Sequence, residues 1–307
     1  MSNPTNRVFI IGAGMVGSTT AFALLLKEVA SEIVFMDRTP EVLEAQVMDL
    51  EHSVPSTSGC VVRAGDYADL MDDDIVVVTC GAAQKEGQTR LDLIKINTEI
   101  ITEIAHKIRD SKKNVYLIMV TNPVDIMTYV ATKESGLDPE RVFGTGTTLD
   151  SSRFKESLSE FFKVNPTDVN AYILGEHGDS SFPATSSANI GSVPLKSMDG
   201  YDENKVLGFA LEAKNAAYKI IAGKKSTYFA IAAVTTDIIK SILRDENKVY
   251  PLTSLLNGEF GLNDVCVSVP HTLGVDGAKI LDEFVMSEDE LDKLNKSAEI
   301  LKSLQNS

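Results

Sequence analysis

The sequence predicts an α/β protein, with a doubly wound parallel sheet followed by a second domain of the α+β class. Up to about residue 145, short apolar runs rich in β-branched residues alternate with longer helical stretches. The first apolar run ends in a glycine-rich turn, and after residue 145 longer helical stretches replace the alternation. Because alternating strands and helices form a parallel sheet covered on both faces, we expect one domain over residues 1–145 and a second over 146–307.

The elements of the first domain are expected in strict alternation. Residues 7–11 form an apolar run typical of a buried parallel strand, and residues 15–28 have helical composition. Later strands are expected at 32–36, 75–79 and 115–121, and the helices between them at 40–51, 91–108 and 123–134.

The second domain is predicted to contain longer helices. Residues 150–162 and 204–222 have helical composition, and residues 249–275 form a mixed region. The last segment carries apolar residues at spacings of three and four, which indicates a helix with one buried stripe. The members of this stripe are Leu291, Leu294, Ala298, Leu301 and Leu304.

Composition limits the function classes. A chain of 307 residues without an apolar run of roughly 18 residues or a signal-peptide pattern predicts a soluble protein that is not exported. Cys60, Cys80 and Cys266 are far apart without a Cys-x-x-Cys spacing, which favours reduced thiols in the cytoplasm and no metal site. A net charge of −15 opposes binding to nucleic acid, because such binding needs a basic surface.

The glycine-rich turn predicts a dinucleotide site. Gly12-Ala13-Gly14-Met15-Val16-Gly17 fits the G-x-G-x-x-G pattern of the Rossmann fold, between a predicted strand and a predicted helix. Asp37 follows the next strand, 20 residues after Gly17, where a carboxylate binds the adenosine ribose and repels a 2′-phosphate. This favours NAD, although the neighbouring Arg38 leaves NADP as an alternative. The other interpretation makes the glycines ordinary turn residues.

The pentapeptide Gly175-Glu176-His177-Gly178-Asp179 indicates acid–base chemistry. Histidine gains and loses a proton near neutral pH, and a carboxylate can orient its second ring nitrogen. Asp150 is a candidate for that carboxylate, and Arg153 lies one helical turn after it. Each also has a structural interpretation, as a helix cap and as a surface ion-pair partner. The remaining histidines have no such neighbours and are interpreted as surface or packing residues: His52, His106 and His271.

With these motifs in order, the chain resembles the L-lactate dehydrogenases over its whole length. Residues 81–93 resemble that family's mobile loop over the substrate, and residues 120–125 and 174–179 match two further motifs. The resemblance implies that His177 is the acid–base residue and that Asp150 orients it. It implies that Arg153 binds the substrate carboxylate and that Arg90, arriving with the loop, polarises the reacting carbonyl.

The resemblance also implies the positions that bind substrate and cofactor. Asn122 would hydrogen-bond near the nicotinamide and the substrate oxygen, while Thr227 and Ile231 would line the substrate and nicotinamide pockets. The further residues implied to bind NAD are Gly81, Ala82 and Val120. A homotetramer is implied as well.

Substrate choice is predicted from Gln84. Malate-using relatives generally have Arg at this loop position, where it pairs with the second carboxylate of oxaloacetate. A neutral Gln leaves such a carboxylate without a countercharge, which favours pyruvate and L-lactate. Alternatives are an L-malate dehydrogenase, a broad L-2-hydroxyacid dehydrogenase, or a noncatalytic NAD-binding protein on the same fold.

Two groups of residues depart from the family pattern. Ala184 and Thr185 replace a usual Val-Trp pair, and Ala230 stands where Gly is common, so longer 2-oxo acids remain possible substrates. Relatives activated by fructose 1,6-bisphosphate place an Arg and a His where this chain has Lys155 and Asn170. Because Asn brings no charge, we predict weak or absent activation.

Overall fold

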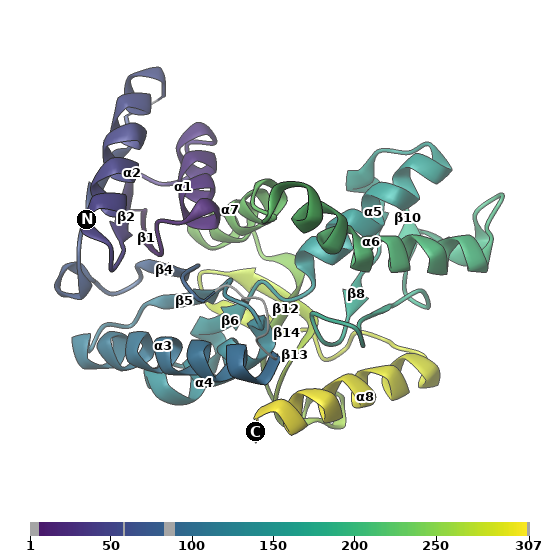
Figure 1. The fold of residues 1–307 in the computed structure, drawn as a ribbon. Coiled ribbons are helices and arrows are strands. Elements are labelled where there is room, and N and C mark those ends of the chain that lie inside the picture. The colour runs from purple at the N-terminus through teal and green to yellow at the C-terminus, as the bar shows by residue number, and fades with distance from the viewer. Residues whose placement is uncertain (1–5, 58, 83–89, 306–307) are drawn as a thin grey trace.

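The fold is built on a single mixed sheet. The computed structural model describes residues 6–57, 59–82 and 90–305, apart from the side chain of Arg90, and within these ranges the sheet has nine strands (Figure 1). Six of them are parallel, in the order β3-β2-β1-β4-β5-β6, and the antiparallel β12, β13 and β14 follow beside β6. The parallel strands are β1 (Arg7–Ile11), β2 (Glu32–Met36), β3 (Val61–Ala64), β4 (Ile75–Val78), β5 (Tyr116–Met119) and β6 (Val142–Gly144). The antiparallel strands are β12 (Lys248–Asn257), β13 (Asn263–Gly274) and β14 (Gly277–Ile280).

Helices cover both faces of this sheet. One face carries α1 (Met15–Leu26), α2 (Pro40–Ser53) and α7 (Phe229–Leu243), and the other carries α3 (Arg90–Ser111) and α4 (Val124–Ser135) (Figure 1). The C-terminal α8 (Glu288–Gln305) packs against β13. None of the described helices is both long enough and apolar enough to cross a bilayer.

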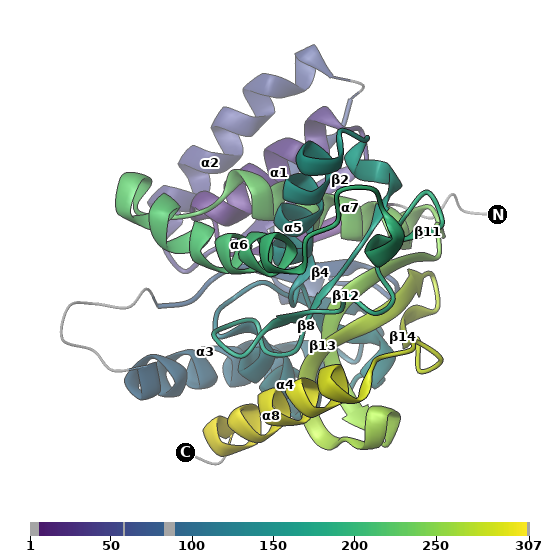
Figure 2. The same ribbon diagram turned by 90° about the vertical axis from the view of Figure 1, so that its right-hand side faces the viewer.

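The remaining elements form a smaller layer beside the carboxyl ends of the parallel strands (Figure 2). Helices α5 (Thr148–Phe162) and α6 (Glu203–Lys224) pack on each other there. Two small sheets accompany them, composed of β7 (Val169–Asn170), β10 (Asn189–Ile190) and β11 (Val193–Pro194), and of β8 (Ile173–Leu174) and β9 (Phe182–Pro183).

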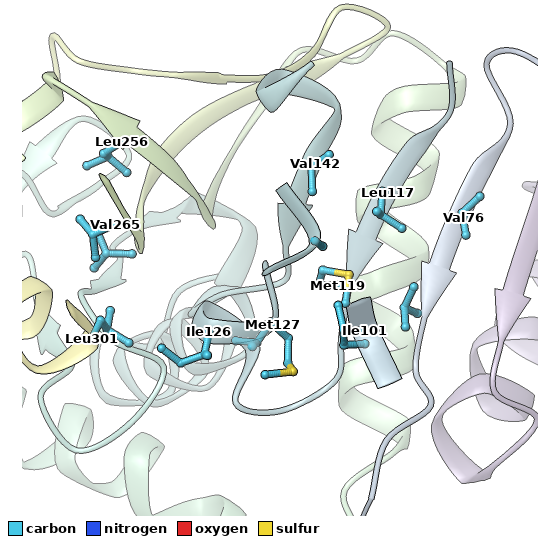
Figure 3. Packing of buried hydrophobic residues seen from close by; sticks show 14 of the residues in the cluster. Val76, Ile101, Leu117, Met119, Ile126, Met127, Val142, Leu256, Val265 and Leu301 are labelled. Carbon is cyan, nitrogen blue, oxygen red and sulfur yellow. The ribbon is translucent and has the colours of Figure 1, made fainter. Parts of the chain in front are cut away.

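Alternate side chains of β1, β2, β4, β5 and β6 enter opposite cores. In β4, Val76 points into the core under α3 and α4, whereas Ile75 points into the core under α1 and α7. Figure 3 shows the first core, in which Met119 of β5 packs near Ile101 of α3 and Met127 of α4. This burial on both faces explains why the parallel strands are continuous apolar runs in the sequence.

The predicted fold class is confirmed, with differences in detail. The first two strands have the predicted bounds, and the predicted helices lie within a few residues of the observed ones. β3 and β6 were not predicted, because β3 has the mixed sequence Val-Val-Arg-Ala with one buried side chain and β6 has only three residues. The mixed region 249–275 is an antiparallel pair that continues the first domain's sheet, joined where Thr253 pairs with Gly144. A Cβ atom at Gly144 would lie 2.6 Å from Cγ2 of Thr253, so glycine permits this junction.

Candidate active site

The glycine-rich turn between β1 and α1 leaves room for a phosphate group. Gly12 has a φ of +112°, and a Cβ atom there would lie 2.6 Å from the backbone nitrogen of Cys80. A Cβ atom at Gly17 would lie 1.9 Å from the carbonyl oxygen of Gly12. Gly14 instead faces open space, with no heavy atom within 4 Å of its Cβ position. The turn therefore fits a dinucleotide whose diphosphate approaches the backbone at Gly14.

The start of α1 and the end of β2 supply polar groups for such a cofactor. Gly14 is the N-cap of α1 and has no side chain to cap the helix, so the turn Met15-Val16-Gly17 presents N–H groups and a positive dipole end. The Asp37 carboxylate accepts hydrogen bonds from the backbone N–H groups of Ala13 at 2.8 Å and Thr39 at 2.9 Å. A half-exposed carboxylate has further acceptor positions, which fits a ribose hydroxyl.

The turns after β4 and β5 are held together by one buried amide. The Asn97 side chain on α3 accepts a hydrogen bond from the Ala82 N–H at 2.7 Å and donates one to the Asn122 carbonyl at 2.8 Å. Gly81 packs closely here, because a Cβ atom on it would lie 2.5 Å from Cγ2 of Thr121. The predicted cofactor positions that follow these two strands, including Val120, therefore lie at one edge of the sheet.

His177 and Asp150 form a hydrogen-bonded pair. His177 lies in the loop after β8, Asp150 lies in the first turn of α5, and His177 Nδ1 is 2.7 Å from Asp150 Oδ2. Because an ionised carboxylate only accepts hydrogen bonds, Nδ1 must carry the proton. This leaves Nε2 as the ring nitrogen that can exchange a proton with a substrate.

Arg153 lies one turn further along α5 with part of its guanidinium unused. Nη1 donates to Asp150 Oδ1 at 3.1 Å and to the Ala213 carbonyl at 3.5 Å. Nη2 is buried and has no hydrogen-bond partner among the described residues. A buried N–H without an acceptor is costly, so a bound carboxylate would satisfy this group and gain a charge-assisted hydrogen bond.

The charges around His177 favour its protonated form. Burial lowers the pKa of His177, but the charge and hydrogen bond of Asp150 and the charge of Asp125 outweigh burial and raise the pKa to about 9. Arg153 opposes this increase. The imidazole is therefore protonated at neutral pH and can donate a proton.

A cavity of about 350 Å³ opens beside this pair. The loop after β8 forms one side, and α6 forms another through Lys214 and Tyr218. Lys214 Nζ donates a hydrogen bond to the Asp179 carbonyl at 2.6 Å, which ties α6 to the loop that carries His177. The other lining residues are Leu93, Asn122, Pro123, Asp150, Gly178, Ser181, Ala217 and Ile221.

Some predicted positions lie outside the described structure or away from the cavity. Gln84 and the side chain of Arg90 are outside the described residues. Thr227 and Ile231 are half-buried, but neither lines the cavity beside His177.

None of the residues that depart from the family pattern is among the residues that line the cavity. Ala184 is buried in the core shared with α3 and α4, and neither Thr185 nor Ala230 lines the cavity. Lys155 Nζ lies 5.0 Å from the centroid of the Tyr172 ring. Asn170 is exposed and donates a hydrogen bond to Asn189 at 3.1 Å.

Sequence reasoning missed three residues that organise the site. Asn97 falls among the apolar positions of α3, and a polar residue in such a stripe is the signal that could have revealed it. Asp125 was noted only as part of a motif, yet its Oδ2 accepts a hydrogen bond from the His177 backbone N–H at 2.8 Å. Lys214 gave no local signal, because a lysine on a helix is ordinarily solvated.

Comparisons with known proteins agree with this geometry. Residues 6–144 match the lactate/malate dehydrogenase NAD-binding domain, and residues 147–307 match the lactate/malate dehydrogenase alpha/beta C-terminal domain. The chain is 43% identical to an L-lactate dehydrogenase of Acetivibrio thermocellus, over 97% of this chain and 96% of that protein. It is 41% identical to L-lactate dehydrogenase 1 of Clostridium acetobutylicum, over 96% of both chains.

Solved structures give the same result. A lactate dehydrogenase from a Medee basin deep-sea metagenome superposes with a TM-score of 0.94 at 38% identity, covering 98% of each chain. The ligand-bound minor L-lactate dehydrogenase of Enterococcus mundtii superposes with a TM-score of 0.93 at 38% identity, covering 98% of this chain and 97% of that one.

Proposed function

We infer that this chain, which belongs to the lactate/malate dehydrogenase family, is an NAD-dependent L-lactate dehydrogenase that interconverts pyruvate and L-lactate. The observation that carries this inference is the His177–Asp150 hydrogen bond beside Arg153, whose buried Nη2 has no acceptor among the described residues. A proton donor and an unsatisfied guanidinium together suit a 2-oxo acid. We assign cofactor binding to residues 1–145 and substrate binding to residues 146–307, a division supported by the junction between the two family matches.

The proton is handled by His177. When NAD is bound, its nicotinamide ring supplies or accepts the hydride. In pyruvate reduction, His177 Nε2 donates a proton to the carbonyl oxygen, and in lactate oxidation it accepts a proton from the hydroxyl group. Asp150 holds Nδ1–H and stabilises the imidazolium, so the ring keeps one tautomer and one orientation.

Arginine side chains bind and polarise the substrate in this proposal. Arg153 binds the carboxylate, because its planar guanidinium can donate two parallel hydrogen bonds. Arg90 is the first residue of α3, and we assign it the polarisation of the reacting carbonyl. Asn122, which lines the cavity, is assigned to the substrate oxygen, and Thr227 and Ile231 to the outer substrate and nicotinamide pockets.

The test is an assay of NADH oxidation with pyruvate, oxaloacetate and branched 2-oxo acids. We expect pyruvate to have the highest kcat/KM. His177→Gln should reduce pyruvate turnover by about a hundredfold to ten-thousandfold, the usual contribution of a general acid. Undiminished turnover by this variant would contradict the mechanism, and absence of turnover in the unmodified protein would favour a noncatalytic NAD-binding role.

Gln84 is the residue to which we assign substrate choice. Gln84→Arg should shift preference toward oxaloacetate, because the new charge offsets the desolvation of a second carboxylate. If this variant keeps an unchanged preference for pyruvate, the assignment of the loop is wrong and a broader L-2-hydroxyacid dehydrogenase is favoured.

We propose weak or absent activation by fructose 1,6-bisphosphate. Lys155 is placed over the Tyr172 ring and the pKa of its amine is lowered by burial, while Asn170 is neutral. Asn170 therefore brings no charge for a phosphate, and Lys155 is the one member of this pair that could attract it. A large decrease in the apparent KM for pyruvate on adding the sugar bisphosphate would contradict this proposal.

We further propose a homotetramer that works in the cytoplasm, in glycolysis and pyruvate fermentation. Leu207 and Leu211 are exposed apolar side chains on α6 that do not line the cavity, which supports burial against another subunit. The three cysteines are unpaired, in keeping with a reducing compartment. Sedimentation analysis should give four times the monomer mass, and a monomer in active preparations would contradict this assembly.

A further inference from the structure

Asp125 is a buried carboxylate that contacts the catalytic loop, although the mechanism above gives it no role. It lies in the first turn of α4 and is 2% exposed. Its Oδ2 accepts a hydrogen bond from the His177 backbone N–H at 2.8 Å. Its Oδ1 is buried and has no hydrogen-bond partner among the described residues.

The surroundings of Asp125 make its charge costly. The groups that face it are His177 and Glu176 from the loop after β8, Thr253 from β12 and Cys266 from β13. Of these, only His177 can carry a positive charge. Burial raises the pKa of Asp125 to about 6, although the charge of His177, the Thr253 side chain and the His177 backbone N–H oppose the increase. The carboxylate is therefore still ionised at neutral pH.

A purely structural role does not require this charge. An asparagine side chain could accept the same backbone hydrogen bond through its amide oxygen, without the desolvation of a buried anion. What asparagine could not supply is a second negative charge beside the imidazole. Among the described residues, the charged groups that act most on His177 are Asp150 and Arg153 from α5 and Asp125 from α4, while Lys214 of α6 and Asp179 line the same cavity. Asp125 acts in the same direction as Asp150.

We propose that Asp125 is a positioning residue, which holds the His177 backbone through its carboxylate and uses its negative charge to keep the imidazole protonated. This inference rests on the proposed function, in which His177 donates the proton to pyruvate. Asp125 touches neither of the reacting groups, so its effect is on the proton affinity of His177 and not on the hydride transfer itself.

The test is Asp125→Asn, which keeps the acceptor and removes the charge. Removing a buried anion without changing its shape should leave the fold intact. The matched control is Asp264→Asn, which removes an equal charge from an exposed aspartate that pairs with Lys133.

Two measurements are made on both variants and on the unmodified protein. The first is the pH dependence of kcat/KM for lactate oxidation, and the second is the pH dependence of His177 modification by diethyl pyrocarbonate without cofactor. His177→Gln identifies the modification that belongs to this ring.

Both midpoints should fall by about one pH unit or more in Asp125→Asn, the usual effect of one nearby opposite charge, and should stay in place in Asp264→Asn. Unchanged midpoints in Asp125→Asn, or equal shifts in both variants, would overturn the inference. If the unmodified protein fails to reduce pyruvate, the proposed function fails instead, and the modification midpoint still measures the effect of Asp125 on His177.

Discussion

Two buried arginine–aspartate pairs in this molecule differ in how completely they are satisfied. Arg7, at the start of β1, donates from Nε to Asp74 Oδ1 at 2.9 Å and from Nη2 to Asp74 Oδ2 at 2.6 Å. Its Nη2 also donates to the Asp69 carbonyl at 2.7 Å. Arg153, on α5, makes one 3.1 Å contact with Asp150, and its buried Nη2 has no partner in the part of the chain that the structure describes.

We interpret this difference as the difference between a structural pair and the proposed substrate site. The Arg7–Asp74 pair lies at the amino ends of the parallel strands, away from the glycine-rich turn, and its forked geometry matches both carboxylate oxygens. In the second pair Asp150 lines the cavity and is shared with His177, whereas Arg153 is not among the lining residues. A guanidinium that uses its N–H donors within the protein has none left for a ligand. A guanidinium with an unused N–H donor can still bind an external carboxylate. Substitutions should therefore affect stability at the first pair and substrate binding at the second.

The largest effect is expected for Arg7→Met. This change leaves Asp74 buried without its charged partner and should lower the free energy of unfolding by about 3 to 5 kcal/mol. Urea denaturation measures the change, and kcat/KM per folded molecule should stay at its original value. The control is Arg7→Met combined with Asp74→Leu, which removes both charges and should recover most of the stability. A double variant no more stable than the single one would show that the pair acts through something other than its charges.

Arg153→Lys should weaken substrate binding and leave the free energy of unfolding almost unchanged, the reverse of what is expected for Arg7→Met. Lysine keeps the charge but loses the two-pronged donor, so we expect kcat/KM for pyruvate to fall by about a hundredfold, equivalent to about 3 kcal/mol. Most of the loss should appear as a raised KM, and the free energy of unfolding should change by less than about 1 kcal/mol. Arg109→Lys, at an exposed position on α3, is the matched control. Unfolding of Arg153→Lys at markedly lower urea would assign this arginine to the fold.

The rates of pyruvate reduction and lactate oxidation should change with pH as His177 titrates. Because its pKa is raised to about 9, the imidazolium needed for pyruvate reduction is present below that pH and is lost as the pH rises through it. Reduction should therefore decline, and lactate oxidation increase, near pH 9 in the absence of saturating substrate. Asp150→Asn should move both midpoints to lower pH by about one unit or more, because the largest charge that favours the imidazolium is gone. Midpoints that stay near 9 would assign the titration to another group.

The same contrast explains what the sequence could predict. The strand β1, its glycine turn and the helix α1 are contiguous, so their pattern indicates both structure and cofactor. Asp150 and Arg153 share one helical turn, which is a local relation as well. The Arg7–Asp74 pair joins residues 67 apart in the chain, and neither residue carries a signal that identifies the other.

Long-range contacts also account for the site residues that were missed. Asp125 lies 52 residues before His177, and its contact is made to a backbone N–H, which any residue type would supply. Asn97 joins two turns through backbone groups in the same way. Sequence patterns report side-chain chemistry, so contacts that depend on the path of the main chain become visible only in the structure.

The smallest effect is expected at Lys214, a cation at the cavity that belongs to neither pair. Its Nζ holds the Asp179 carbonyl, and its charge lies beside the cavity in a chain of net charge −15. Lys214→Met should lower kcat/KM for pyruvate about fivefold, or about 1 kcal/mol, at low salt, because the anionic substrate loses a local attraction. The deficit should shrink as salt screens that attraction, and Lys214→Arg should restore most of the activity. Lys219→Met, which removes an exposed lysine from the same helix, is the control. An equal loss in the control, or a deficit that does not change with salt, would mean that Lys214 acts only by fastening α6 to the loop of His177.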